Sequence, residues 1–159
     1  MTAKTHIASW WSGYVGMPYA EMGRGRDGVD CWGLVHLAFA ECHGVSLADT
    51  AGVSAAAGAR IAALAQAELS KPVWSRIKEG FETDFDLVIV WRPYRTMAAG
   101  WRTGPVHCGL VAGPDHILHA DADTDVVRVT YRPPHASLQS QRFEFWRFQD
   151  AEALAGVAA

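Results

Sequence analysis

The sequence predicts an α+β protein in which N-terminal helices pack on an antiparallel sheet of about five strands. Two observations support this fold class. Apolar residues recur at helical spacing only between residues 5 and 69, whereas β-branched runs and alternating patterns fill residues 86–148. Helices followed by a series of neighbouring strands are typical of α+β proteins with an antiparallel sheet.

Three helices are predicted in the first half of the chain. Residues 5–15 have an amphipathic pattern that ends at Gly16, and a second helix is expected from about residue 31 to residue 43. Gly44 follows it as a natural C-terminal cap. An alanine-rich third helix is expected over residues 54–69.

The second half is predicted to be built from strands. The second and third of them are joined by a tight turn at residues 113–115, which contains the sequence Gly-Pro-Asp. The expected strands cover residues 86–91, 106–113, 116–120, 127–131 and 142–148.

Length and charge limit the classes of function. A chain of 159 residues is most simply one domain, with a core over about 5–148 and a short tail at 149–159. A net charge of −3 argues against a general nucleic-acid binder, and no apolar run approaches the roughly 20 residues of a membrane span. The N-terminus resembles no export signal, so we expect synthesis in the cytoplasm without one.

Cys31 is the first candidate for chemistry. It lies where a glycine-rich loop gives way to a predicted helix, with Asp30 placed to cap that helix. A helix N-terminus favours the thiolate, which is the nucleophilic form. Free cysteines are also among the most buried residue types, so position alone leaves a structural role equally open.

His107 and His119 supply the partner that a nucleophilic cysteine needs. If the turn spans residues 113–115, Gly109 falls opposite His119, and both histidines share one face of the sheet. They are then diagonal neighbours within reach of a hydrogen bond, and Gly109 leaves the space between them empty. This geometry favours a nucleophile at Cys31.

A metal site is the competing interpretation of the polar residues in this region. Neighbours such as His107 and Cys108 point to opposite faces of a strand, as do His116 and His119. Asp121 and Asp123 begin a sequence like a calcium loop, which lacks the glycine and the final glutamate that such loops require. We therefore predict no metal and no cofactor.

Two segments resemble the NlpC-type cell-wall cysteine peptidases, a papain-like family. They are "GMPYAEMGRGRDGVDCWGLV" (16–35) and "HCGLVAGPDHILHA" (107–120). The usual Gly-Asp before the first histidine strand is here Phe85-Asp86. The resemblance implies a papain-like fold over roughly residues 5–148.

The resemblance also implies roles for individual residues. Cys31 would be the nucleophile, His107 the general base and acid, and His119 the residue that orients His107. The oxyanion and substrate sites would be formed around Tyr19, Asp30 and Trp32. The implied reaction is hydrolysis of an amide bond in a peptidoglycan stem peptide.

Trp32 departs from the common pattern, in which serine follows the cysteine. "DCWGL" is more similar to versions found in the tails of bacteriophages and gene-transfer particles. We therefore expect a virion tail location, with tail or baseplate proteins as partners. Two alternatives remain: a structural tail component with little activity, and a thiol amidase or acyltransferase on the same scaffold.

Overall fold

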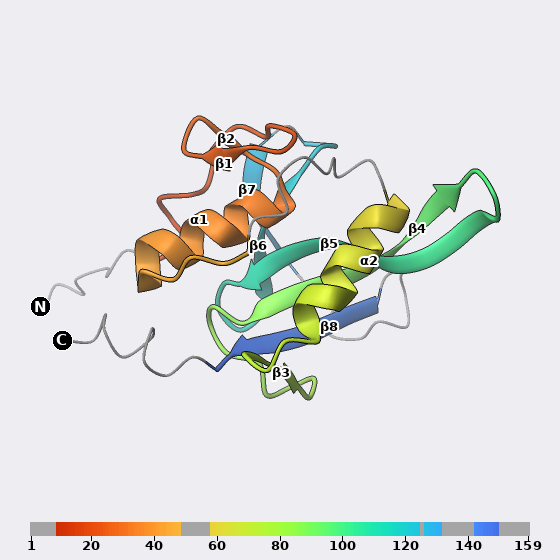
Figure 1. Ribbon diagram of the computed structural model, residues 1–159. Helices are drawn as coiled ribbons and strands as arrows, with labels where there is room; N and C mark the ends of the chain where they lie inside the picture. The colour runs from red at the N-terminus through yellow and green to blue at the C-terminus, as the bar shows by residue number, and fades with distance from the viewer. Residues whose placement is uncertain (1–8, 49–57, 125, 132–141, 150–159) are drawn as a thin grey trace, which may run out of the picture.

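The computed structural model describes residues 9–48, 58–124, 126–131 and 142–149. Within these ranges the chain forms two helices and two sheets (Figure 1). The elements in chain order are β1 (Arg24–Gly25), β2 (Gly28–Val29), α1 (Cys31–His43), α2 (Gly58–Leu69), β3 (Trp74–Ile77), β4 (Leu87–Thr96), β5 (Gly100–Val111), β6 (His116–Asp121), β7 (Val126–Tyr131) and β8 (Arg142–Phe148).

The main sheet has six antiparallel strands in the order β3-β8-β4-β5-β6-β7. Both helices cover the same face, because Leu87 and Ile89 of β4 lie in the core beneath α1 and also line a pocket against α2. The small hairpin of β1 and β2 precedes α1 directly. The predicted α+β class is confirmed, and β3 adds a strand to the five expected.

The core is divided by the sheet. On the covered face, fully buried side chains of α1, such as Leu34 and Phe39, pack with Leu110 and Leu118 of the sheet. A smaller apolar cluster on the opposite face includes Val88, Val90, Val111, Ile117 and Phe145. None of the helices in the described ranges has the length and apolar character needed to cross a lipid bilayer.

The predicted helix over residues 5–15 is wrong for its described part. Residues 10–16 form successive turns with hydrogen bonds to the third preceding residue instead of the fourth. The N–H of Gly16 bonds the carbonyl of Val127 at 2.9 Å, and the N–H of Val127 bonds the carbonyl of Met17 at 2.8 Å. These bonds to β7 hold the segment against the sheet. Residues 5–8, and 54–57 of the third predicted helix, lie outside the described residues.

The strands expected over residues 86–91 and 106–113 are both longer than predicted. β4 and β5 continue as an antiparallel hairpin arm that extends beyond the rest of the sheet (Figure 1). Past Trp91, β4 pairs with β5 alone, so Pro93 needs no hydrogen bond on its outer side. Strand β3 is only four residues long and pairs with β8 at the edge, which explains why no alternation revealed it.

Gly109 is required by the close approach of β5 and β6. A Cβ at this position would lie 2.5 Å from the carbonyl oxygen of Leu118 and 3.0 Å from Cβ of His119. We expect Gly109→Val to lower the free energy of unfolding by about 2–3 kcal/mol through overpacking. Denaturant unfolding measures this, with Gly13→Ala as control because a Cβ there meets nothing. Equal stability of the two variants would contradict the close approach.

Candidate active site

The first turn of α1 is anchored by Asp30, which is buried. Its carboxylate accepts hydrogen bonds from the N–H of Gly33 at 2.7 Å, the N–H of Met22 at 3.1 Å and the Arg24 guanidinium at 2.9 Å. Burial raises the pKa of Asp30, against the opposing effects of Gly33 and Arg24. The predicted N-cap is confirmed, and these bonds hold Cys31, the first residue of the helix, in place.

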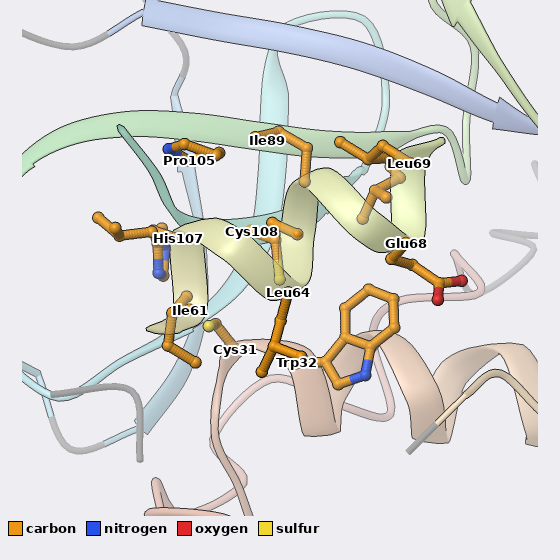
Figure 2. A pocket seen from close by; sticks show the side chains of 13 residues that line it. Cys31, Trp32, Ile61, Leu64, Glu68, Leu69, Ile89, Pro105, His107 and Cys108 are labelled. Atoms are coloured by element: carbon orange, nitrogen blue, oxygen red, sulfur yellow. The ribbon is translucent and has the colours of Figure 1, made fainter. Parts of the chain in front are cut away.

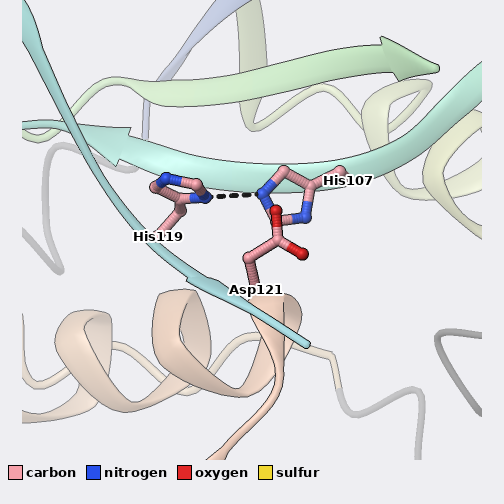
Figure 3. A group of neighbouring side chains, drawn as sticks. All are labelled: His107, His119 and Asp121. Carbon is pink, nitrogen blue, oxygen red and sulfur yellow. Dashed lines mark hydrogen bonds between the residues drawn. The ribbon is translucent and has the colours of Figure 1, made fainter. Parts of the chain in front are cut away.

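The two histidines meet as their spacing predicts. The N–H of Ala112 bonds the carbonyl of His116, and the pairing of Leu110 with Leu118 places Gly109 opposite His119. His107 Nε2 then lies 2.8 Å from His119 Nδ1, with both rings buried (Figure 3). One imidazole therefore orients the other.

Cys31 and His107 share a cleft of about 390 Å³, which Tyr19, Arg92 and Asp121 also line. Figure 2 shows the Cys31 side chain at the N-terminal end of α1, with its sulfur directed toward the His107 ring. Because Nε2 of His107 is bonded to His119, Nδ1 is the nitrogen left to exchange a proton with the thiol.

The Cys31 thiol is set up to ionise. Hydrogen bonding from the Cys108 side chain, followed by hydrogen bonding and charge at His107, lowers its pKa well below the ordinary value, although burial opposes this. The pKa of Cys108 is raised well above its ordinary value by the hydrogen bond to Cys31 and by burial. Cys108 therefore remains a protonated donor, and both thiols are free.

Strand alternation predicts that Cys108 faces away from the histidines, and no sequence motif assigns it a role in the site. Strand alternation does place it with Ile89 and Leu110 on the helix-covered face, and Cys31 approaches from that face. A β-bulge between Val90 and Trp91 lies opposite this part of β5. Such bulges bend and twist a strand, an effect that alternation alone does not predict.

Tyr19 and Trp32 each line a pocket next to Cys31. Burial, and then the negative charges of Cys31 and Asp30, raise the pKa of Tyr19 to about 12, so its hydroxyl stays available as a donor. The Trp32 indole N–H donates to the carbonyl of Ala48 at 3.1 Å. Its ring lines an apolar pocket of about 50 Å³ beside Cys31, between α1 and α2 (Figure 2).

Asp121 and Arg92 join the site without having been assigned to it from the sequence. One carboxylate oxygen of Asp121 and one ring nitrogen each of His107 and His119 lie within 4.8 Å of one another. Arg92 Nη2 lies 3.1 Å from the Asp121 carboxylate. Burial acts to raise the pKa of Asp121, but the charges of His107 and Arg92 lower it. Alternation along β6 places Asp121 on the face of His119, a signal that could have identified it.

This trio is close enough to share a cation. However, its two imidazoles are bonded to each other and its carboxylate is paired with Arg92, an arrangement suited to holding protons. The absence of a metal stays a prediction.

A cysteine at a helix N-terminus that faces a histidine on an antiparallel sheet is an arrangement typical of the papain-like cysteine peptidases. The NlpC/P60 family matches residues 16–147, and the chain belongs to this family.

Solved structures agree on the fold. The chain is similar to the NlpC/p60 domain of the peptidoglycan hydrolase SagA, with a TM-score of 0.51, 17% identity, and coverage of 86% of this chain and 92% of that one. It is also similar to NlpC2 from Trichomonas vaginalis, with a TM-score of 0.52, 17% identity and 92% of this chain covered. The match spans 48% of NlpC2. No match was found among curated proteins.

The unusual Phe85-Asp86 pair has a structural consequence. Phe85 adopts φ 74°, a left-handed conformation that favours glycine, the residue usual at this position. Its ring lies 4.5 Å from Trp10, 5.0 Å from Phe39 and 4.2 Å from His43, between ring centroids. Aromatic packing therefore offsets backbone strain at this position.

Removing the Cys108 donor tests its effect on Cys31. We expect Cys108→Ala to slow alkylation of Cys31 by iodoacetamide about tenfold on the acid side of its pH profile, because the thiolate loses a hydrogen bond. Peptide mapping by mass spectrometry measures the rate. Cys108→Ser should restore part of it, and Cys42→Ala should leave it unchanged. An unaltered profile in Cys108→Ala would show that Cys108 does not stabilise the thiolate.

Proposed function

We propose that this protein is a peptidoglycan-degrading cysteine endopeptidase that hydrolyses amide bonds of stem peptides. The observation that carries the proposal is the meeting of Cys31 with the bonded pair His107 and His119 in one open cleft. Membership of the NlpC/P60 family and similarity to a domain of a peptidoglycan hydrolase support the choice of substrate.

The first half of the reaction forms an acyl-enzyme. His107 takes the proton of the Cys31 thiol, and the thiolate attacks the amide carbonyl carbon. The backbone N–H of Cys31 and the hydroxyl of Tyr19 would donate to the resulting oxyanion, a type of interaction worth about 3–4 kcal/mol. When the C–N bond breaks, protonated His107 gives its proton to the leaving amine.

The second half releases the enzyme. His107 removes a proton from water, and the hydroxide attacks the thioester carbonyl. The C–S bond then breaks to give a carboxylic acid, and protonated His107 returns its proton to the Cys31 sulfur. His119 keeps the His107 ring in the orientation that both halves need, as its 2.8 Å contact indicates. The indole of Trp32 presents an apolar wall next to the nucleophile, where it would influence which bond is accepted.

Digestion of purified sacculi tests the proposal. We expect the protein to release stem peptides with new ends, identified by mass spectrometry. Cys31→Ala and His107→Ala should reduce this release at least a thousandfold, because each removes a group that acts in the chemical step.

His119→Asn should retain more activity than His107→Ala, because an amide can still orient the ring. Cys42→Ala is the matched control and should digest sacculi like the unaltered protein. Absence of new ends with folded protein, or full activity of Cys31→Ala, would reject the proposed reaction.

We further propose that the enzyme acts on the cell wall from the tail of a phage-like particle, docked on tail or baseplate proteins. The similarity of "DCWGL" to tail-borne versions supports this location. Purified particles from the producing bacterium should contain the chain in stoichiometric amounts by mass spectrometry. Its absence from particles would reject the location. Particles carrying Cys31→Ala that penetrate the wall normally would instead favour a structural tail component.

A further inference from the structure

We propose that Asp121, held by Arg92, is a positioning residue whose negative charge stabilises the ion pair formed when a proton passes from Cys31 to His107. The inference rests on the proposed roles of Cys31 and His107. It goes beyond them by adding a carboxylate and its counter-charge to the groups that set the working pH range of the site.

The geometry places the carboxylate beside the histidine pair. Asp121 is two residues beyond His119 on β6, and its side chain is only 12% exposed. Figure 3 shows its carboxylate directed toward His107. One of its oxygens and one ring nitrogen each of His107 and His119 lie within 4.8 Å of one another. The N–H of Asp123 donates to Oδ1 of Asp121 at 3.4 Å, and Arg92 donates to Oδ2, so both carboxylate oxygens have partners.

Arg92 holds the Asp121 carboxylate in place. Its Nη2 lies 3.1 Å from Asp121, while its Nε is buried without a hydrogen-bond partner among the described residues. Arg92 follows the bulge at Trp91 on β4 and lines the same cleft. The guanidinium therefore lies in the site although one of its nitrogens makes no hydrogen bond to the described part of the chain. In this position it forms an ion pair with Asp121.

The physical effect follows from the sign of each charge. When a proton moves from Cys31 to His107, a negative charge near the imidazolium stabilises the ion pair, and a positive charge destabilises it. Asp121 lies beside the imidazole, and Arg92 partly cancels its charge. Among the described residues, the titratable or charged groups that face this site are Tyr19, Glu21, Arg24, Asp30, Cys31, Arg92, Tyr94, His107, Cys108, His119 and Asp121.

Alkylation of Cys31 by iodoacetamide as a function of pH measures the ion pair directly. In Asp121→Asn the half-maximal rate on the acid side should move to higher pH, with a loss of about threefold or more at a fixed pH on that limb. Arg92→Gln should move it the opposite way. The double variant should lie between the two, because both charges are then removed. Every sample contains EDTA, so that trace metal contributes nothing.

Controls separate this electrostatic effect from a structural one. Asp123→Asn, at an exposed carboxylate two residues away, and Arg95→Gln, at an exposed arginine on the same strand, should leave the profile unchanged. Asp121→Glu should restore the acid limb. Circular dichroism and thermal unfolding confirm that each variant is folded, and Arg92→Gln provides an independent test if Asp121→Asn is not.

An acid limb that does not move in folded Asp121→Asn, or that moves the same way in both single variants, would overturn the inference. The assay contains no peptidoglycan, so its outcome is independent of the substrate. A protein that leaves sacculi intact but shows the opposed shifts would reject the proposed function and keep the role of Asp121.

Discussion

The antiparallel pairing of β5 with β6 is the contact on which the site depends. Residues on a strand alternate between faces, so a shift of one residue would turn His119 away from His107. The hydrogen bond from Ala112 to His116 fixes the register, and Gly109 allows the strands to approach without a side chain between the two rings. Backbone hydrogen bonds thus place two imidazoles at 2.8 Å, and no long side chain has to be ordered separately.

The N-terminus of α1 brings Cys31 to this pair. Asp30 ties the helix start to two backbone N–H groups and to Arg24, so Cys31 cannot swing away from the sheet. Burial alone would favour the neutral thiol, yet the Cys108 donor, His107 and the helix N-terminus all favour the thiolate. The hydrogen bonds and charges that favour the thiolate are therefore built into the fold.

Local sequence patterns predicted the elements that have strong periodicity and recognisable ends. Helix α1 was found with its caps at Asp30 and Gly44, and the histidine pair was found from strand alternation and a three-residue turn. The turns at residues 10–16 depend on hydrogen bonds to β7, which is distant in sequence, so no local pattern reveals them. The hairpin arm at 93–104 pairs only with itself and has mostly exposed or half-exposed side chains, so it lacks the apolar alternation that predicts a strand.

The sequence by itself determined the nucleophile candidate, the histidine pair and the family, because each depends on short motifs or on alternation within one hairpin. Tertiary structure alone decided which further groups complete the site. Cys108 approaches Cys31 only when α1 packs on β5, and Arg92 reaches Asp121 only because β4 and β6 flank β5. The electrostatic environment depends on distances between elements far apart in the chain, which residue spacing does not encode.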